Sequence, residues 1–303
     1  MGSFIYFFHK KVCPPYFTLM ISTLGLAIAF SPTAERMLAE AVALAERFKA
    51  RLVLIHVGEH GEKEEQLLNL LLARHPFPSE RLAVRWEKGD PARAILKVCD
   101  DEFIDLLVAG ALKKENLLHY YLGTIARTIM RRAHCSVLLL TQPSPNPDGF
   151  KNVVVDAEDG PFVNETISLA CQLCQAQNKA WVHVVRELKL YGLAMSASDQ
   201  CSEDEYELIR QGLIKDEVEK VEGFLEKIPH GNLKINIKVI SGKSGFELSQ
   251  FAQRKQADLL VVGAPVRRFS LFDRVFTHDL EYIFADMPCN LLIVNSRKEE
   301  TGA

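Results

Sequence analysis

The chain has 303 residues, of which 48% are hydrophobic and 25% charged, and its formal net charge is −3. This length suits two domains of ordinary size, each able to bury its own core. The small negative charge gives no reason to expect nucleic acid or an anionic membrane as a partner. The chain has seven cysteines, an odd number that excludes a complete disulfide framework and favours a reducing, cytoplasmic location.

The N-terminal 23 residues are expected to be a leader outside the folded domains. His9-Lys10-Lys11 followed by the apolar Thr18 to Phe30 resembles a secretory signal. The segment Leu24 to Phe30 can equally be a buried first strand, and we favour the strand because the segment has a counterpart later in the chain. No later apolar stretch is long enough to predict a membrane-spanning helix.

An internal repeat is the main feature of the sequence. Four residues recur after 153 positions: Gly89, Asp105, Gly110 and Thr124 return as Gly242, Asp258, Gly263 and Thr277. Nearer the start of each copy, Ala27-Ile28-Ala29 is aligned with Val154-Val155-Asp156 and His56 with His183, both at an offset of 127. The difference predicts an insertion of 26 residues in the second copy, around Arg186 to His230.

The repeat predicts two domains, at residues 24–141 and 152–296, followed by a tail at 297–303. Between them, residues 142–151 form a Pro-rich, polar linker that can continue neither domain.

Each copy has an alternating order of strands and helices. Leu52 to Val57 and Leu106 to Ala109 are apolar runs typical of parallel strands buried on both faces. Apolar residues recur at helical spacing from Ala34 to Phe48, and Asp90-Pro91 is a typical helix start. The order predicts an α/β fold with right-handed crossovers and a parallel sheet, whose ligands bind at the carboxyl ends of the strands.

On these residues the chain resembles the universal stress protein family twice, over about Leu24 to Thr141 and Asn152 to Ser296. The resemblance implies two five-stranded parallel sheets of the adenine-nucleotide alpha hydrolase-like type. ATP-binding members of the family carry Gly-x2-Gly-x9-Gly-Ser/Thr after strand four, whose backbone amides hold the phosphates. They also carry an aspartate at the end of strand one, near the adenine and ribose.

The first copy retains most of that phosphate-binding pattern. Its candidate nucleotide-binding residues are Gly110, Lys113, Gly123 and Thr124. Lys113 replaces the middle glycine, where it either adds charge to a bound phosphate or fills the space that the missing glycine leaves. Gly123-Thr124 opens a helix whose free amides favour a phosphate, and Gly123 allows close backbone approach and a positive φ. The strand-one aspartate is expected to fall on Ala29 and is therefore absent.

The second copy retains a different part of the pattern. Its weaker candidate residues are Asp156, Gly242, Gly263 and Thr277. Asp156 is the strand-one aspartate, but Val266 and Phe276 replace two glycines. A phenylalanine ring in the place of phosphate oxygens should abolish tight triphosphate binding. Gly242 lies in Ser241-Gly242-Lys243-Ser244, which is read as a strand-to-helix turn because a P-loop would need a glycine at Ile237.

No catalytic or metal-binding group is predicted. Cys171 and Cys174 form a C-x-x-C well inside a helix, whereas a redox pair usually opens one. His56 and His183 are expected to share one strand position, as a property of the fold. An enzyme is therefore less expected than a binding protein.

Three functions remain open from the sequence. The first is a non-enzymatic stress-response regulator or binding module. The second is an ATP- or AMP-binding protein that uses the glycine loop of the first copy, with slow hydrolysis as an extension. No carboxylate is placed to orient an attacking water, which argues against hydrolysis. The third is a structural adaptor with two vestigial pockets.

The last strands of the two copies are the expected association surface. The resemblance implies that two such domains pair through these strands, Ser136 to Leu140 and Asn290 to Val294. Both are apolar, and a sheet edge leaves its backbone groups unpaired. We therefore expect an internal pseudo-dimer with antiparallel last strands, while a homodimer of the whole chain stays open.

Overall fold

The computed structural model describes residues 21–113, 120–121, 123–160, 162–174, 180–188, 203–241, 245–264 and 278–295. Contacts divide the chain into two compact units. The N-terminal unit comprises the described residues from 21 to 148 together with Ala264 and residues 284–295. The central unit comprises the described residues from 149 to 263 together with residues 278–283. The last strand of the chain thus belongs to the same compact unit as the first repeat.

Alternating strands and helices build the N-terminal unit. Its elements are β1 (Thr23–Ala27), α1 (Ala34–Phe48), β2 (Arg51–Val57), α2 (Glu62–Arg74), η1 (Ser79–Arg81), β3 (Leu82–Glu87), α3 (Pro91–Asp101), β4 (Leu106–Gly110), β5 (Leu112–Lys113), β6 (Tyr120–Tyr121), α4 (Thr124–Arg132), β7 (Ser136–Leu140) and β12 (Asn290–Val294). The strand order is β12-β7-β4-β1-β2-β3, and a separate ribbon pairs β5 with β6. All neighbours in the larger sheet are parallel except β12, which runs antiparallel to β7.

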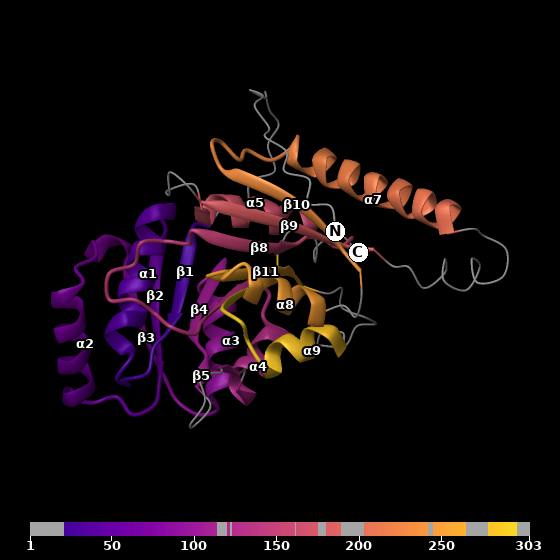
Figure 1. Ribbon diagram of the computed structural model, residues 1–303. Coiled ribbons are helices and arrows are strands. Elements are labelled where there is room, and N and C mark those ends of the chain that lie inside the picture. The colour runs from indigo at the N-terminus through magenta and orange to yellow at the C-terminus, as the bar shows by residue number, and fades with distance from the viewer. Residues whose placement is uncertain are drawn as a thin grey trace. The chain divides into compact units, whose positions relative to one another are not determined.

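Right-handed crossovers place α1 and α2 on one face of this sheet and α3 and α4 on the other (Figure 1). The central strands are fully buried, with Leu24, Leu26, Leu54 and Leu106 at zero exposure. Burial on both faces explains why these strands are continuous apolar runs. Within β1, a Cβ on Gly25 would lie 2.6 Å from Ile104 Cδ1, so a larger residue there would force the Ile104 side chain to move.

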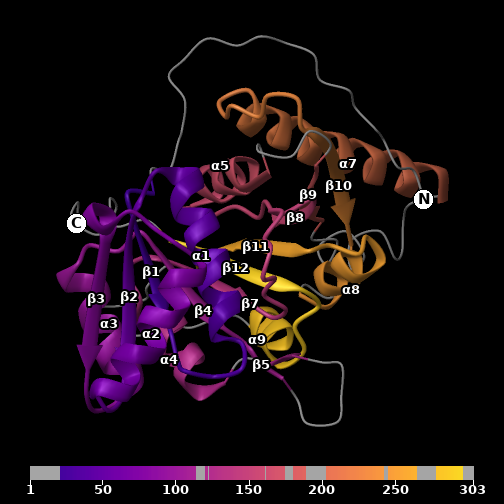
Figure 2. The same ribbon diagram turned by 90° about the vertical axis from the view of Figure 1, so that its left-hand side faces the viewer.

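The central unit repeats the same plan with a longer helix between its second and third strands. Its elements are β8 (Asn152–Asp156), α5 (Val163–Cys174), β9 (Trp181–Glu187), α7 (Glu203–Leu225), β10 (Lys234–Ile240), α8 (Phe246–Arg254), β11 (Leu259–Gly263) and most of α9 (His278–Ala285). The strand order is β10-β9-β8-β11, all parallel. The longer helix is α7, with 23 residues where its counterpart α2 has 13; it packs against β10 and crosses it in the view of Figure 2.

Asp105 and Asp258 repeat because each ties the start of its unit's first strand to the sheet. The Asp105 carboxylate accepts hydrogen bonds from the Ser22 and Thr23 amides at 2.8 and 2.9 Å. The Asp258 carboxylate accepts from the Lys151 amide at 2.7 Å. The repeated aspartate is therefore a structural device at the amino end of the sheet.

Strand register corrects the alignment of the two repeats. Leu24 lies beside Leu106, and Val153 beside Leu259, so Asp156 corresponds to Ala27 and the expected match with Ala29 is wrong. In the second strands, Leu52 pairs with Leu24 and Val182 with Val153. His183 therefore corresponds to Val53, and His56 corresponds to Arg186. The expected shared position of the two histidines is also wrong, and the insertion is shorter than the 26 residues inferred at the outset.

Candidate functional site

The candidate ligand edge of the N-terminal unit is formed by the carboxyl ends of its parallel strands. We call it the carboxyl edge; it is defined by the strand ends Ala27, Val57, Glu87 and Gly110. Gly110 is exposed as the last residue of β4, and Lys113 pairs with Tyr120 in the β5–β6 ribbon. The chain then returns to Gly123 and enters α4 at Thr124. Open α/β sheets bind ligands at this edge.

Gly123 and Thr124 form the start of α4 as the sequence predicts. Gly123 is the buried N-cap, and Thr124 is the exposed first helical residue. The first turn holds no acidic residue, so no carboxylate competes for its free amides. Gly123 has φ −69° and ψ 166°, so the expected positive φ is wrong. A need for left-handed backbone does not explain this glycine.

The same carboxyl edge also carries, at β1, β2 and β3, a group of rings that the sequence reasoning missed. Phe30 and His56 have centroids 4.7 Å apart, and His56 and Trp86 are 5.3 Å apart. His60 stacks on Trp86 at 4.4 Å and 9°. We call Phe30, His56, His60 and Trp86 the ring cluster. A usable signal was present for His56, which stands one residue before the end of the predicted strand Leu52 to Val57, whereas no predicted strand contained Trp86.

Backbone geometry holds His56 in the ring cluster. Its Nδ1 lies 3.1 Å from the Ile28 carbonyl oxygen, to which it donates a hydrogen bond. A Cβ on Gly58 would lie 2.9 Å from His56 Nε2, so the glycine makes room for the imidazole. The ring thus joins the end of β2 to the residue after β1.

Arg186 takes the place of His56 in the central unit and is held there by hydrogen bonds. Its guanidinium donates to the Ala157 carbonyl oxygen at 2.5 Å and to both carboxylate oxygens of Asp159 at 2.9 and 2.8 Å. A further bond at 2.6 Å reaches Glu217 of α7. The side chain of Arg186 is only 4% exposed. One buried cation therefore fastens the loop after β8 and helix α7 together.

Asp156 ends β8 next to this network. Burial, reinforced by the charge of Glu158, raises the pKa of Asp156 to about 7. Its Oδ1 accepts the Glu158 amide at 3.1 Å, and Arg186 only partly offsets the rise. The carboxyl edge of the central unit is thus rich in carboxylates, which disfavours an anionic ligand.

The remaining second-repeat candidates are less informative. Gly263 is the last residue of β11, and a Cβ there would lie 3.2 Å from Thr166 Oγ1. Gly242, Val266, Phe276 and Thr277 lie outside the described residues. Their predicted roles stay predictions.

In the central unit, His183 and Cys171 have structural rather than chemical roles. His183 lies between Asn152 Oδ1 at 3.0 Å and Asn236 Nδ2 at 2.9 Å. Burial lowers the pKa of His183 to about 4 and raises that of the Cys171 thiol to about 12. Among the described residues, no group of three or more His, Cys, Asp or Glu side chains could hold a metal ion.

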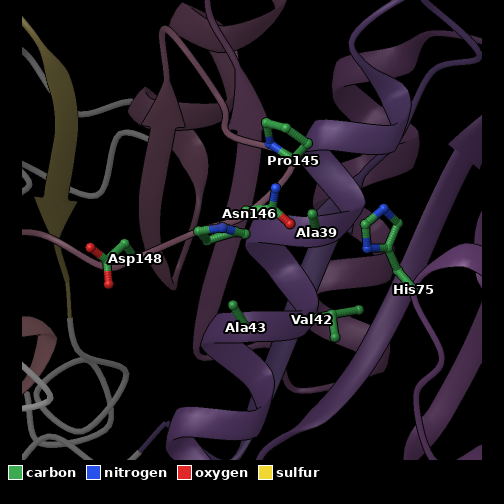
Figure 3. Close-up of a pocket in the computed structure, with 8 residues that line it drawn as sticks. Ala39, Val42, Ala43, His75, Pro145, Asn146 and Asp148 are labelled. Atoms are coloured by element: carbon green, nitrogen blue, oxygen red, sulfur yellow. The ribbon is translucent and has the colours of Figure 1, made fainter.

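A pocket of about 560 Å³ lies along α1 of the N-terminal unit, away from the predicted residues (Figure 3). It is lined by Ala39, Val42, Ala43, His75, Pro145, Asn146, Pro147 and Asp148. Glu40 of α1 fastens the adjoining linker by accepting the Ser144 amide at 2.9 Å. The pocket is thus a gap between α1 and the docked linker.

Comparison with known proteins agrees with this architecture. The family model described as "Universal stress protein family" matches residues 20–141. A universal stress protein of Methanocaldococcus jannaschii is 26% identical over 122 residues, covering 34% of this chain and 72% of the relative. Across the described residues, no helix is both long and apolar enough to cross a membrane.

Solved structures match nearly the whole chain in fold. A Pseudomonas aeruginosa protein described as functionally unknown has a TM-score of 0.70 at 14% identity, covering 92% of this chain and 94% of its own. A universal stress protein from Archaeoglobus fulgidus has a TM-score of 0.59 at 11% identity, covering 91% and 98%. In sequence, residues 20–141 thus match the universal stress protein family, and over the rest of the chain the likeness is one of fold.

Proposed function

We propose that the chain is a non-enzymatic stress-response binding module whose N-terminal unit binds an adenine nucleotide, ATP or AMP. The start of α4 carries this proposal. Gly123 and Thr124 present backbone amides at the carboxyl edge, and the helix dipole favours a phosphate there. Gly110 and Lys113 lie on the segment that leads from β4 toward this helix. Thr124 adds an exposed hydroxyl at the same place.

The central unit is proposed to have a regulatory or structural role instead. The guanidinium of Arg186 is already hydrogen-bonded to Asp159, Glu217 and a backbone carbonyl oxygen. The acidic surroundings of Asp156 disfavour phosphate, so Asp156, Gly242, Gly263 and Thr277 are expected to contribute little to nucleotide binding.

We also propose that the two repeats associate through their last strands as an internal pseudo-dimer. The antiparallel pairing of β12 with β7 supports this, with Leu292 opposite Leu138. The Ser136 hydroxyl donates to the Asn295 carbonyl oxygen at 2.9 Å, and Asn290 Oδ1 accepts the Thr141 amide at 2.8 Å. A homodimer of the whole chain and a cytoplasmic location stay predictions.

Calorimetry with AMP and ATP on the purified chain tests the nucleotide proposal. Wild type should bind, and Gly123→Phe should not, because the ring would cover the amides at the start of α4. Circular dichroism of the variant checks that α4 and the sheet are retained. A parallel assay of phosphate release should show no ATP turnover; measurable turnover that Gly123→Phe abolishes would instead favour the slow-ATPase alternative.

A further inference from the structure

The ring cluster is an unusual use of aromatic side chains. None of Phe30, His56, His60 and Trp86 is fully buried, and His60 is exposed. Large rings stabilise a fold chiefly by being buried. Here they are gathered at the surface around the carboxyl ends of β1, β2 and β3, the edge where this type of sheet takes its ligands.

His60 covers a face of Trp86 without being packed into the core. The two rings are nearly parallel, at 9° with 4.4 Å between centroids. The other attachment of His60 is a bond of 2.7 Å from its Nε2 to Glu65 Oε1, a carboxylate that is itself 57% exposed. Such an exposed pair adds little stability. His60 can therefore leave the face of Trp86 at a small cost in free energy.

The same stack holds the start of α2. This helix begins at Glu62, and its N-cap, Gly61, makes no side-chain hydrogen bond. Leu68 is the one fully buried residue along α2. Leu70, by contrast, is 60% exposed. The contact of His60 with Trp86 therefore attaches the start of α2, while Arg74 attaches its end by pairing with Glu35 of α1 at 2.8 Å.

We propose that the face of Trp86 covered by His60 is a stacking site for a planar heteroaromatic ring such as a nucleobase. An incoming ring displaces His60 and so loosens the start of α2. The pairing with a phosphate rests on the proposed function: three strand spacings separate β4 from β3, roughly 14 Å. An extended ATP can thus place its base on Trp86 and its terminal phosphates near Gly123, whereas AMP is too short to reach both.

Tryptophan fluorescence provides a direct test. The chain has two tryptophans, so Trp181→Phe leaves Trp86 as the sole reporter. AMP and adenosine should quench it in a saturable manner, whereas inorganic phosphate should leave it unchanged. Amide hydrogen exchange in residues 62–67 should accelerate when adenosine is added.

Two variants in this background test the displacement. His60→Ala should tighten adenosine binding about two- to ten-fold, because the competing stack is gone. Trp86→Leu should weaken it about five-fold or more, as measured by calorimetry. Thermal unfolding checks that Trp86→Leu folds. His134→Ala is the matched control, since His134 pairs with Asp100 outside the ring cluster.

The outcomes separate the two proposals. If AMP binds but neither the fluorescence of Trp86 nor the His60→Ala affinity changes, the stacking site is wrong and the phosphate site stands. If adenosine quenches Trp86 and ATP binds no more tightly than adenosine, the stacking site stands and the phosphate site is contradicted. If neither compound binds, both are contradicted.

Discussion

His56 and Arg186 occupy the same position of the two repeats, and each donates a hydrogen bond to the carbonyl oxygen of the residue after the first strand. His56 bonds Ile28 at 3.1 Å, and Arg186 bonds Ala157 at 2.5 Å. The same position thus carries a partly exposed ring in one unit and a buried, fully paired cation in the other. His56 is therefore accessible for contact with other rings in the N-terminal unit, whereas Arg186 is taken up by its own hydrogen bonds in the central unit.

Removing the cation should destabilise the central unit. Arg186→Met is expected to lower the free energy of unfolding by about 3–5 kcal/mol, because Glu217 and the Ala157 carbonyl lose their buried partner. Urea denaturation measures the loss. Arg210→Met is the control, since the Arg210–Glu207 pair is exposed and should matter little. Equal effects of the two substitutions on the free energy of unfolding would contradict the stabilising role of Arg186.

Asp156 should make the central unit less stable as the pH rises. Its pKa is raised from 3.8 to about 7 in the folded chain, so the folded state holds a proton that the unfolded state has released. The stabilising contribution is full below about pH 4 and is lost as the pH rises through 7. Asp156→Asn should therefore be more stable than wild type at pH 8, with the difference shrinking toward pH 4. Urea denaturation across this range measures it, and a constant difference would refute the shift.

His183 should act in the opposite direction. Burial lowers its pKa from 6.5 to about 4, so its contribution is full above pH 6.5 and is lost as the pH falls toward 4. Proton NMR of the imidazole should find it neutral at pH 5.5. His134, which lies in an exposed pair, serves as the reference resonance. A titration of His183 near pH 6.5 would show that burial does not lower its pKa.

Ser136 should be important for the attachment of the last strand. Its hydroxyl donates to the Asn295 carbonyl oxygen at 2.9 Å and accepts the Asn295 amide at 3.1 Å, both buried. Ser136→Ala leaves these groups unpaired and should cost about 1–3 kcal/mol in unfolding free energy. Ser144→Ala, which loses only an exposed bond to the Asn146 amide, should change it by less than about 0.5 kcal/mol.

The sequence predicted the α/β order, the family and the two last strands well, because apolar runs and glycine positions carry that information locally. The correspondence between strand positions in the two repeats was harder to predict from the sequence. In the alignment of the two repeats, Val153, Val154 and Val155 match the apolar residues of β1 at more than one offset. The presence of a histidine at both position 56 and position 183 then led to the wrong offset. Only the hydrogen bonding between strands identifies Ala27 as the residue of the first repeat that corresponds to Asp156.

The site was predictable in its backbone part and not in its side chains. Gly123-Thr124 could be placed at a helix start from the sequence. The Arg186 network joins residues from β9, the loop after β8 and α7, and no local pattern links positions so far apart. The ring cluster likewise depends on β1, β2 and β3 ending at one edge.

Calorimetric titration of AMP into wild type, Thr124→Ala and Thr124→Pro tests the nucleotide site most directly. Thr124 is the first residue of α4, where proline is compatible with the helix but removes the backbone N–H. Thr124→Ala keeps that N–H and loses only the hydroxyl. We predict that Thr124→Pro weakens AMP binding by about ten-fold or more and Thr124→Ala by clearly less. AMP binding of wild-type strength in Thr124→Pro would contradict a phosphate site at the start of α4.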